Sequence, residues 1–124
     1  MRREVLQSAG TRAIGPYSPG VVAGSLLFTS GQIPHRPSGE LVDADIRSAT
    51  RQCLENVRAV LLAGGADLEN VVKVTVFLVD LGDFSAMNEV YAEFFPERPP
   101  ARTCVQVGAL PKGARVEIEA VALL

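Results

Sequence analysis

The chain has 124 residues, 48% of them hydrophobic and 21% charged, which argues against disorder and predicts one folded domain over residues 1–124. Its 12 lysines and arginines and 14 acidic residues give a net charge of −2, so no broad basic surface is expected for nucleic acid. Two cysteines and the lack of an apolar run of membrane-spanning length predict a cytoplasmic protein with no disulfide framework and no membrane partner.

The N-terminal region is predicted to form β-structure, with a short strand near Val5. Further along, apolar runs flank Gly24-Ser25. A glycine followed by a polar residue between two such runs favours a hairpin with a type II′ turn. The second strand of this hairpin, residues 26–30, is followed by Gly31-Gln32-Ile33-Pro34, where we expect it to end.

Two helices are predicted from apolar residues that recur about every 3.6 residues. The first begins after Asp43 or Asp45, either of which could cap it, and ends at Gly64-Gly65. The second is capped by Asp83 and ended by Pro96. The two apolar stripes are Ile46, Ala49, Cys53, Leu54, Val57, Val60 and Leu61, and Met87, Val90, Tyr91, Phe94 and Phe95.

Three more strands complete the expected order. Alternating side chains predict a strand over residues 72–79, with Val72, Val74 and Val76 on one face. Two final strands are predicted over residues 102–108 and 115–123. We interpret the Pro111-Lys112-Gly113 turn between them as a hairpin loop.

The order β-β-α-β-α-β-β indicates an α/β (α+β) fold with a mixed sheet. Because each helix links two strands, right-handed crossovers place both helices on the same face of the sheet. Apolar residues also occupy the opposite face, among them Phe77, Val79, Val121 and Leu123. A sheet that is apolar on both faces needs cover on both, so we predict a homo-oligomer formed through the open face.

Arg102 and Glu117 lie on the two final predicted strands. Arg102 shares a face with Cys104, and Glu117 shares a face with Glu119. If these strands are neighbours, a surface ion pair is the simpler interpretation. The functional interpretation is that the arginine fork binds a carboxylate while the glutamate moves protons. The spacing leaves both interpretations open.

Other candidate residues have ordinary explanations. Tyr17 and Ser30 are hydroxyl residues beside glycine turns, a common setting without any function. His35 lies in a proline-rich loop, where we expect it to be solvated. Cys53 belongs to the apolar stripe and is predicted to lie in the core, whereas Cys104 has no histidine motif to support nucleophilic catalysis. One histidine and two scattered cysteines argue against a metal site.

Six segments together match one protein family, in order along the chain. They are residues 13–18 (AIGPYS), 28–34 (FTSGQIP), 72–78 (VKVTVFL), 87–91 (MNEVY), 100–104 (PARTC) and 117–120 (EIEA). With these segments the chain closely resembles the RidA family of reactive-intermediate (enamine/imine) deaminases, whose relatives are also called endoribonuclease L-PSP or translation inhibitors. One such segment is weakly specific, but six collinear segments are highly specific.

The resemblance implies a chorismate-mutase-like fold with two helices on one face, a homotrimer with sites at the subunit clefts, and no cofactor. It also implies a 2-iminobutanoate/2-iminopropanoate deaminase. Such an enzyme hydrolyses 2-aminoacrylate, 2-iminopropionate and related 2-imino acids to 2-keto acids and ammonia. These imines escape from pyridoxal-phosphate enzymes.

The matching motifs also imply the site residues. Arg102 would bind the substrate carboxylate, and Glu117 would position the attacking water and pass protons. The other matching positions would shape the pocket or supply backbone contacts. They are Tyr17, Ser30, Gly31, Asn88, Cys104 and Pro111.

Two other classes of function stand as alternatives. A ribonuclease or translation inhibitor would need a basic groove and stacking aromatics, which a net charge of −2 and 6% aromatic residues disfavour. The other is a non-catalytic role, either as a holdase chaperone or as a small-ligand sensor, and a sensor would bind 2-keto acids without turning over imines.

Overall fold

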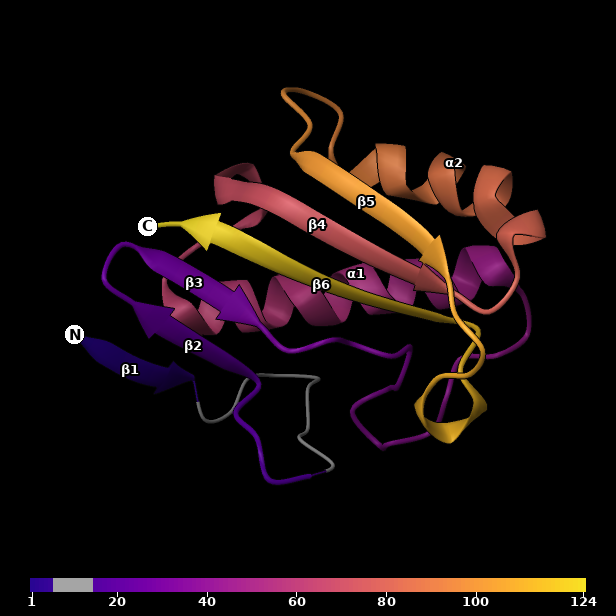
Figure 1. The fold of residues 1–124 in the computed structure, drawn as a ribbon, viewed down its shortest axis with the longest axis horizontal. Helices are drawn as coiled ribbons and strands as arrows, with labels where there is room; N and C mark the ends of the chain where they lie inside the picture. Colours follow the sequence, from indigo (N-terminus) through magenta and orange to yellow (C-terminus); the bar gives the residue numbers. More distant parts are fainter. Residues whose placement is uncertain (6–14) are drawn as a thin grey trace.

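The computed structural model of the protein describes residues 1–5 and 15–124 (Figure 1). Ala13 and Ile14, the first two residues of the matching segment at 13–18, lie outside these ranges. The described residues form a mixed six-stranded sheet and two α-helices in the predicted order. The elements are β1 (Arg2–Val5), β2 (Gly20–Ala23), β3 (Leu26–Thr29), α1 (Ile46–Gly64), η1 (Leu68–Asn70), β4 (Val71–Leu78), η2 (Leu81–Asp83), α2 (Phe84–Phe94), β5 (Ala101–Gln106), η3 (Pro111–Gly113) and β6 (Val116–Leu123).

The strands lie in the order β1-β2-β3-β6-β4-β5, and β4 and β5 run parallel while the other neighbours are antiparallel. The prediction that the last two strands form a hairpin is therefore wrong, because β4 lies between them. The crossover through α2 sets β5 along the outer edge of β4, whereas β6 inserts between β3 and β4. The η3 turn at residues 111–113 thus connects strands that are not neighbours.

The N-terminal hairpin has the predicted turn. Ala23 pairs with Leu26, which leaves Gly24-Ser25 as the two-residue loop. Gly24 has a φ of 61°, and Ser25 is not among the described residues with positive φ. Positive φ at the first central position alone is the type II′ pattern, which glycine adopts without strain. The short strand predicted near Val5 is β1, which pairs with β2.

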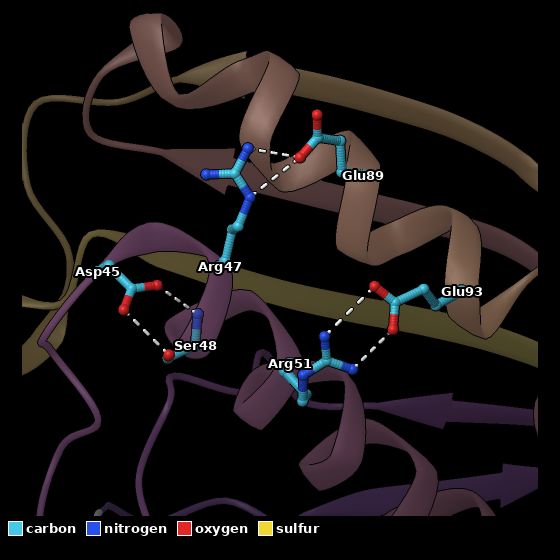
Figure 2. A network of polar contacts seen from close by, with 6 residues as sticks. All are labelled: Asp45, Arg47, Ser48, Arg51, Glu89 and Glu93. Carbon is cyan, nitrogen blue, oxygen red and sulfur yellow. Dashed lines mark hydrogen bonds and ion pairs between the residues drawn. The ribbon is translucent and has the colours of Figure 1, made fainter.

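Helix α1 is capped at both ends as its sequence predicts. Of the two N-cap candidates, Asp45 is the cap, and its carboxylate accepts hydrogen bonds from the backbone N–H and the hydroxyl of Ser48 (Figure 2). Gly65 ends the helix with a left-handed φ of 98°. In the part of the chain that the structure describes, no helix is both long enough and apolar enough to cross a membrane.

Helix α2 begins differently from the prediction. Asp83 occupies the N-cap position, but its side chain makes no cap hydrogen bond. The preceding turn η2 is capped instead, because the Asp80 carboxylate accepts a hydrogen bond from the backbone N–H of Gly82 at 2.8 Å. The acidic residue that caps the turn before α2 is thus Asp80.

Two ion pairs join α2 to α1 on the protein surface. Arg47 pairs with Glu89, and Arg51 pairs with Glu93 one helical turn further along (Figure 2). Exposed ion pairs add little stability, so packing provides most of it. Both pairs lie between α1 and α2, the helix that carries Asn88 and Tyr91.

Strand β4 departs from strict alternation at its start. A bulge lies between Val71 and Lys73, where the register with β6 shifts. The extra residue turns Val72 outward, and its side chain is 45% exposed although the alternation predicts it beside Val74 and Val76.

Both helices cover one face of the sheet, as predicted (Figure 1). Cys53 is 0% exposed in the core beneath α1, which confirms its predicted position. The opposite face keeps large apolar side chains in contact with solvent, including Phe28 at 43% and Leu123 at 49% exposed. The open face that the sequence predicts is therefore present in the isolated chain.

Candidate functional site

A cavity of about 290 Å³ lies at the end of the sheet where β3 stops and β6 begins. In Figure 1 the segment after β3 and the η3 turn approach each other at this end. Five of the eight predicted site residues are among its lining residues. The lining residues are Tyr17, Ser30, Gly31, Gln32, Ile33, His35, Pro111 and Glu117.

Glu117 contributes the carboxylate of this cavity. It lies on β6 opposite Phe77 of β4, so its side chain points to the open face of the sheet. Partial burial raises the pKa of the Glu117 carboxyl above its ordinary value of 4.5, and the negative charge of Glu119 raises it further. A carboxyl with a raised pKa at a cavity wall is a candidate for a general acid or base.

Gly31 leaves the space that the Glu117 carboxylate occupies. A Cβ atom at position 31 would overlap Oε2 of Glu117 and lie 2.8 Å from its Cδ. Any side chain at position 31 therefore displaces the carboxylate. Here glycine is required by close approach, since its φ lies outside the positive range.

We expect Gly31→Ala to lower by about 100-fold any activity that uses the Glu117 carboxylate while the protein still folds, because a displacement of about 1 Å misplaces that group. Steady-state kinetics with a thermal unfolding curve would test this. Gly108→Ala is the matched control, since a Cβ there meets no atom within 4 Å. Equal activity in the two variants would contradict this role of Gly31.

Hydrogen bonds fix the segments on either side of Gly31. The Ser30 hydroxyl donates to the carbonyl oxygen of Ser18 at 2.6 Å, which ties the end of β3 to the loop that carries Tyr17. Gln32 exchanges two backbone hydrogen bonds with Ile118 of β6, at 2.8 and 3.0 Å. These bonds hold the loop beside Glu117 without using that carboxylate.

Asn56 of α1 holds the part of the cavity wall that contains Ile33 and His35. It is 2% exposed, and its amide nitrogen donates to the carbonyl oxygens of Ile33 at 3.1 Å and His35 at 2.9 Å. The amide oxygen accepts a hydrogen bond from Gln52 at 2.9 Å. The same anchoring makes His35 only 6% exposed, so the prediction that this histidine is solvated is wrong.

We expect Asn56→Ala to lower the free energy of unfolding by about 1–3 kcal/mol, because it leaves two buried carbonyl groups without their donor. Urea unfolding measured by circular dichroism would test this. Gln52→Ala removes only the bond to the Asn56 oxygen and should cost less. Equal losses in both variants would show that Asn56 does not anchor the loop.

Arg102 lies on the other face of the sheet. It is on edge strand β5 opposite Val74, and its side chain reaches toward α2. One guanidinium nitrogen donates to the Asn88 side-chain oxygen at 2.6 Å. The guanidinium carbon lies 4.6 Å from the Tyr91 ring centre and 5.5 Å from that of Phe84. The ring faces and the amide hold the charged fork in a defined orientation.

Cys104 packs beside Arg102 against the core. Burial raises the pKa of the Cys104 thiol, although the Arg102 charge works in the opposite direction. A raised pKa keeps the sulfur as a thiol at neutral pH, so the residue acts here as packing.

The predicted site residues therefore form two half-sites in one chain. The Glu117 half-site comprises Tyr17, Ser30, Gly31, Pro111 and Glu117. The Arg102 half-site comprises Asn88, Arg102 and Cys104. Strand β4 separates the strands that carry them, and the two acting side chains point to opposite faces. The cross-strand ion pair considered from the sequence is therefore wrong.

The comparisons with known proteins agree with this fold. The family model described as Endoribonuclease L-PSP matches residues 7–124 of the chain. The chain belongs to this family, the RidA family. RutC family protein PH0854 of Pyrococcus horikoshii is 50% identical over 123 residues, which are 98% of each chain.

Two further members of the RidA family bear on activity. The human 2-iminobutanoate/2-iminopropanoate deaminase is 45% identical over 124 residues, 99% of this chain and 90% of that protein. A crystal structure of Escherichia coli TdcF with bound serine has a TM-score of 0.93 at 45% identity and covers 98% of both chains. The family thus includes a protein named as an imine deaminase and a member that binds a small amino acid.

Two residues that build the cavity lie outside the six RidA-family segments of the sequence. Asn56 lies three residues after Cys53 and one before Val57, within the apolar stripe of α1. A polar residue on such a stripe indicates a buried hydrogen bond, and this signal could have identified it. His35 gave no comparable signal, because its burial depends on Asn56 and on the fold of the 33–42 loop.

Proposed function

We propose that the protein hydrolyses 2-imino acids to 2-keto acids and ammonia, with Glu117 and Arg102 as the acting side chains. The single observation that carries this proposal is the raised pKa of Glu117 in a cavity that Gly31 keeps open for its carboxylate. Membership of a family that contains a named imine deaminase supports the same reaction.

The reaction makes modest demands on a protein. The carbon of a protonated 2-imino acid is already electrophilic, so it needs an oriented water and a proton carrier. In the proposed sequence, the Glu117 carboxylate takes a proton from water as the oxygen bonds to the imine carbon. The proton then passes from Glu117 to the nitrogen, the Glu117 carboxylate takes the proton of the new hydroxyl as the carbon–nitrogen bond breaks, and ammonia and the 2-keto acid leave.

Arg102 is the proposed anchor for the substrate carboxylate. An arginine fork pairs with a carboxylate through two parallel hydrogen bonds. Asn88 accepts one of the five guanidinium N–H groups, which leaves donors for a ligand. The aromatic rings of Tyr91 and Phe84 limit the motion of the fork, so less conformational entropy is lost on binding.

A second copy of the chain is proposed to unite the two half-sites, because Glu117 and Arg102 of one chain point to opposite faces. The open face offers half-exposed apolar side chains for such contact, including Phe28, Val105 and Leu123. A head-to-tail contact between identical chains gives a closed ring when its rotation closes, and we propose the homotrimer that the family resemblance implies. Sedimentation should therefore find no stable monomer at micromolar concentration.

The proposed activity can be measured directly. An amino-acid oxidase or a dehydratase generates the imine, and semicarbazide traps the imine that remains. We expect the protein to lower semicarbazone formation and speed the release of 2-keto acid. A protein that binds 2-keto acids yet leaves the imine lifetime unchanged would instead be a ligand-binding protein.

A further inference from the structure

His35 is a buried polar side chain in the cavity wall that the proposed reaction does not use. Its side chain contributes to the same cavity as Glu117, and only 6% of the residue is exposed. Its position is fixed by three backbone contacts. The carbonyl oxygen accepts a hydrogen bond from Asn56, the N–H donates to Ile33 at 2.8 Å, and the residue forms a β-bridge with Leu41.

One nitrogen of the His35 ring contacts a backbone carbonyl group, and the other has no protein partner among the described residues. Nδ1 lies 3.3 Å from the carbonyl oxygen of Arg36. A carbonyl oxygen only accepts, so this contact places the ring proton on Nδ1 and leaves Nε2 as the acceptor of the neutral imidazole. Within residues 1–5 and 15–124, no protein atom makes a hydrogen bond to Nε2. Nε2 is not among the buried side-chain atoms without a partner in the described residues, so it is accessible at the cavity wall, where a ligand can donate a hydrogen bond to it.

The rest of the wall has three polar side chains besides Glu117, those of Tyr17, Ser30 and Gln32. The Ser30 hydroxyl donates to Ser18, and the Gln32 amide donates to the Ser30 carbonyl oxygen at 3.3 Å. Ile33 and Pro111 are apolar. Glu117 makes a negatively charged side chain unfavourable nearby and adds a second acceptor. The wall therefore fits a ligand group that donates hydrogen bonds.

We infer that His35 selects 2-imino acids whose side chain donates a hydrogen bond, such as a primary amide, over aliphatic and acidic side chains of the same shape. This inference rests on the proposed function, because it assigns the substrate class of the same cavity. His35 is a specificity-determining residue in this account and takes no part in the proton transfers.

Three amino acids of nearly equal shape test this inference. Asparagine, leucine and aspartate yield imines whose side chains are a donor amide, an alkyl group and an acceptor carboxylate. We expect the wild type to have the highest kcat/KM for the asparagine imine. In His35→Leu the ratio of asparagine to leucine kcat/KM should fall about three- to tenfold. His35→Gln, which keeps an acceptor, should retain part of the preference.

The outcomes separate this inference from the proposed function. If the wild type hydrolyses these imines but His35→Leu leaves the asparagine-to-leucine ratio unchanged, the inference fails and the deaminase proposal stands. A preference for the aspartate imine that depends on His35 would also overturn it, because the ring would then act as a cation. If the wild type hydrolyses no imine at all, both fail. Thermal unfolding curves that match the wild type would show that the variants are folded.

Discussion

Glu117→Gln is expected to lower kcat/KM for 2-iminopropionate by about 10²–10⁴-fold, the usual contribution of a positioned acid–base group. The amide keeps the size of the side chain but cannot take a proton from water. Because burial and Glu119 raise the pKa of Glu117, the wild-type rate should increase with pH through a midpoint above 4.5. A pH profile of kcat/KM in the coupled assay would measure both effects.

Glu119→Gln is the matched control for this variant. It lies on the same strand and face as Glu117 but does not line the cavity. Removing its charge should lower the pKa of Glu117, so the acidic limb of the profile should move to lower pH while the plateau rate is kept. If Glu117→Gln retains the wild-type plateau, Glu117 is not the proton carrier.

Arg102→Ala is expected to lower kcat/KM by about 10–150-fold, because a hydrogen bond to a charged group contributes about 1.5–3 kcal/mol. The loss should appear mainly in KM if the carboxylate contact is equally strong in substrate and transition state. Arg102→Lys should recover only part of the loss, since a point charge cannot form the two parallel bonds of the fork.

A remote arginine controls for general effects of charge and folding. Arg58 forms a surface pair with Asp67 at 2.9 Å and does not line the cavity. Arg58→Ala should leave kcat/KM unchanged, and both variants should sediment as the wild type does. Wild-type kinetics in Arg102→Ala would show that Arg102 does not bind the substrate carboxylate.

The local parts of the fold could be predicted from the sequence because their signals are local. The apolar stripe, the Asp45 cap and the Gly65 stop of α1 lie within a few residues of the structure they determine. The same holds for the Gly24-Ser25 turn. The position of β6 could not be predicted in this way, since its insertion between β3 and β4 depends on pairing with residues up to nearly 100 positions away.

The candidate site was likewise predictable only where its signals are local or belong to the family motifs. The collinear motifs predicted Arg102 and Glu117 as site residues, but spacing alone favoured a surface ion pair that the strand order excludes. The burial of His35 depends on Asn56, 21 residues further along the chain, so no local pattern could reveal it. The sequence could not show that the two half-sites lie on opposite faces of the sheet. Which side chains of two strands share a face is known only once the order and pairing of the strands are known.

Mixing two impaired variants tests most directly whether two chains share each site. Arg102→Ala keeps the Glu117 half-site and Glu117→Gln keeps the Arg102 half-site, so a contact between them contains one intact pair. Equal amounts, refolded together, should regain about one quarter of wild-type activity, since each partner is correct in about half of the contacts. Activity no greater than that of the separate variants, in mixed oligomers verified by mass, would contradict a site shared between chains.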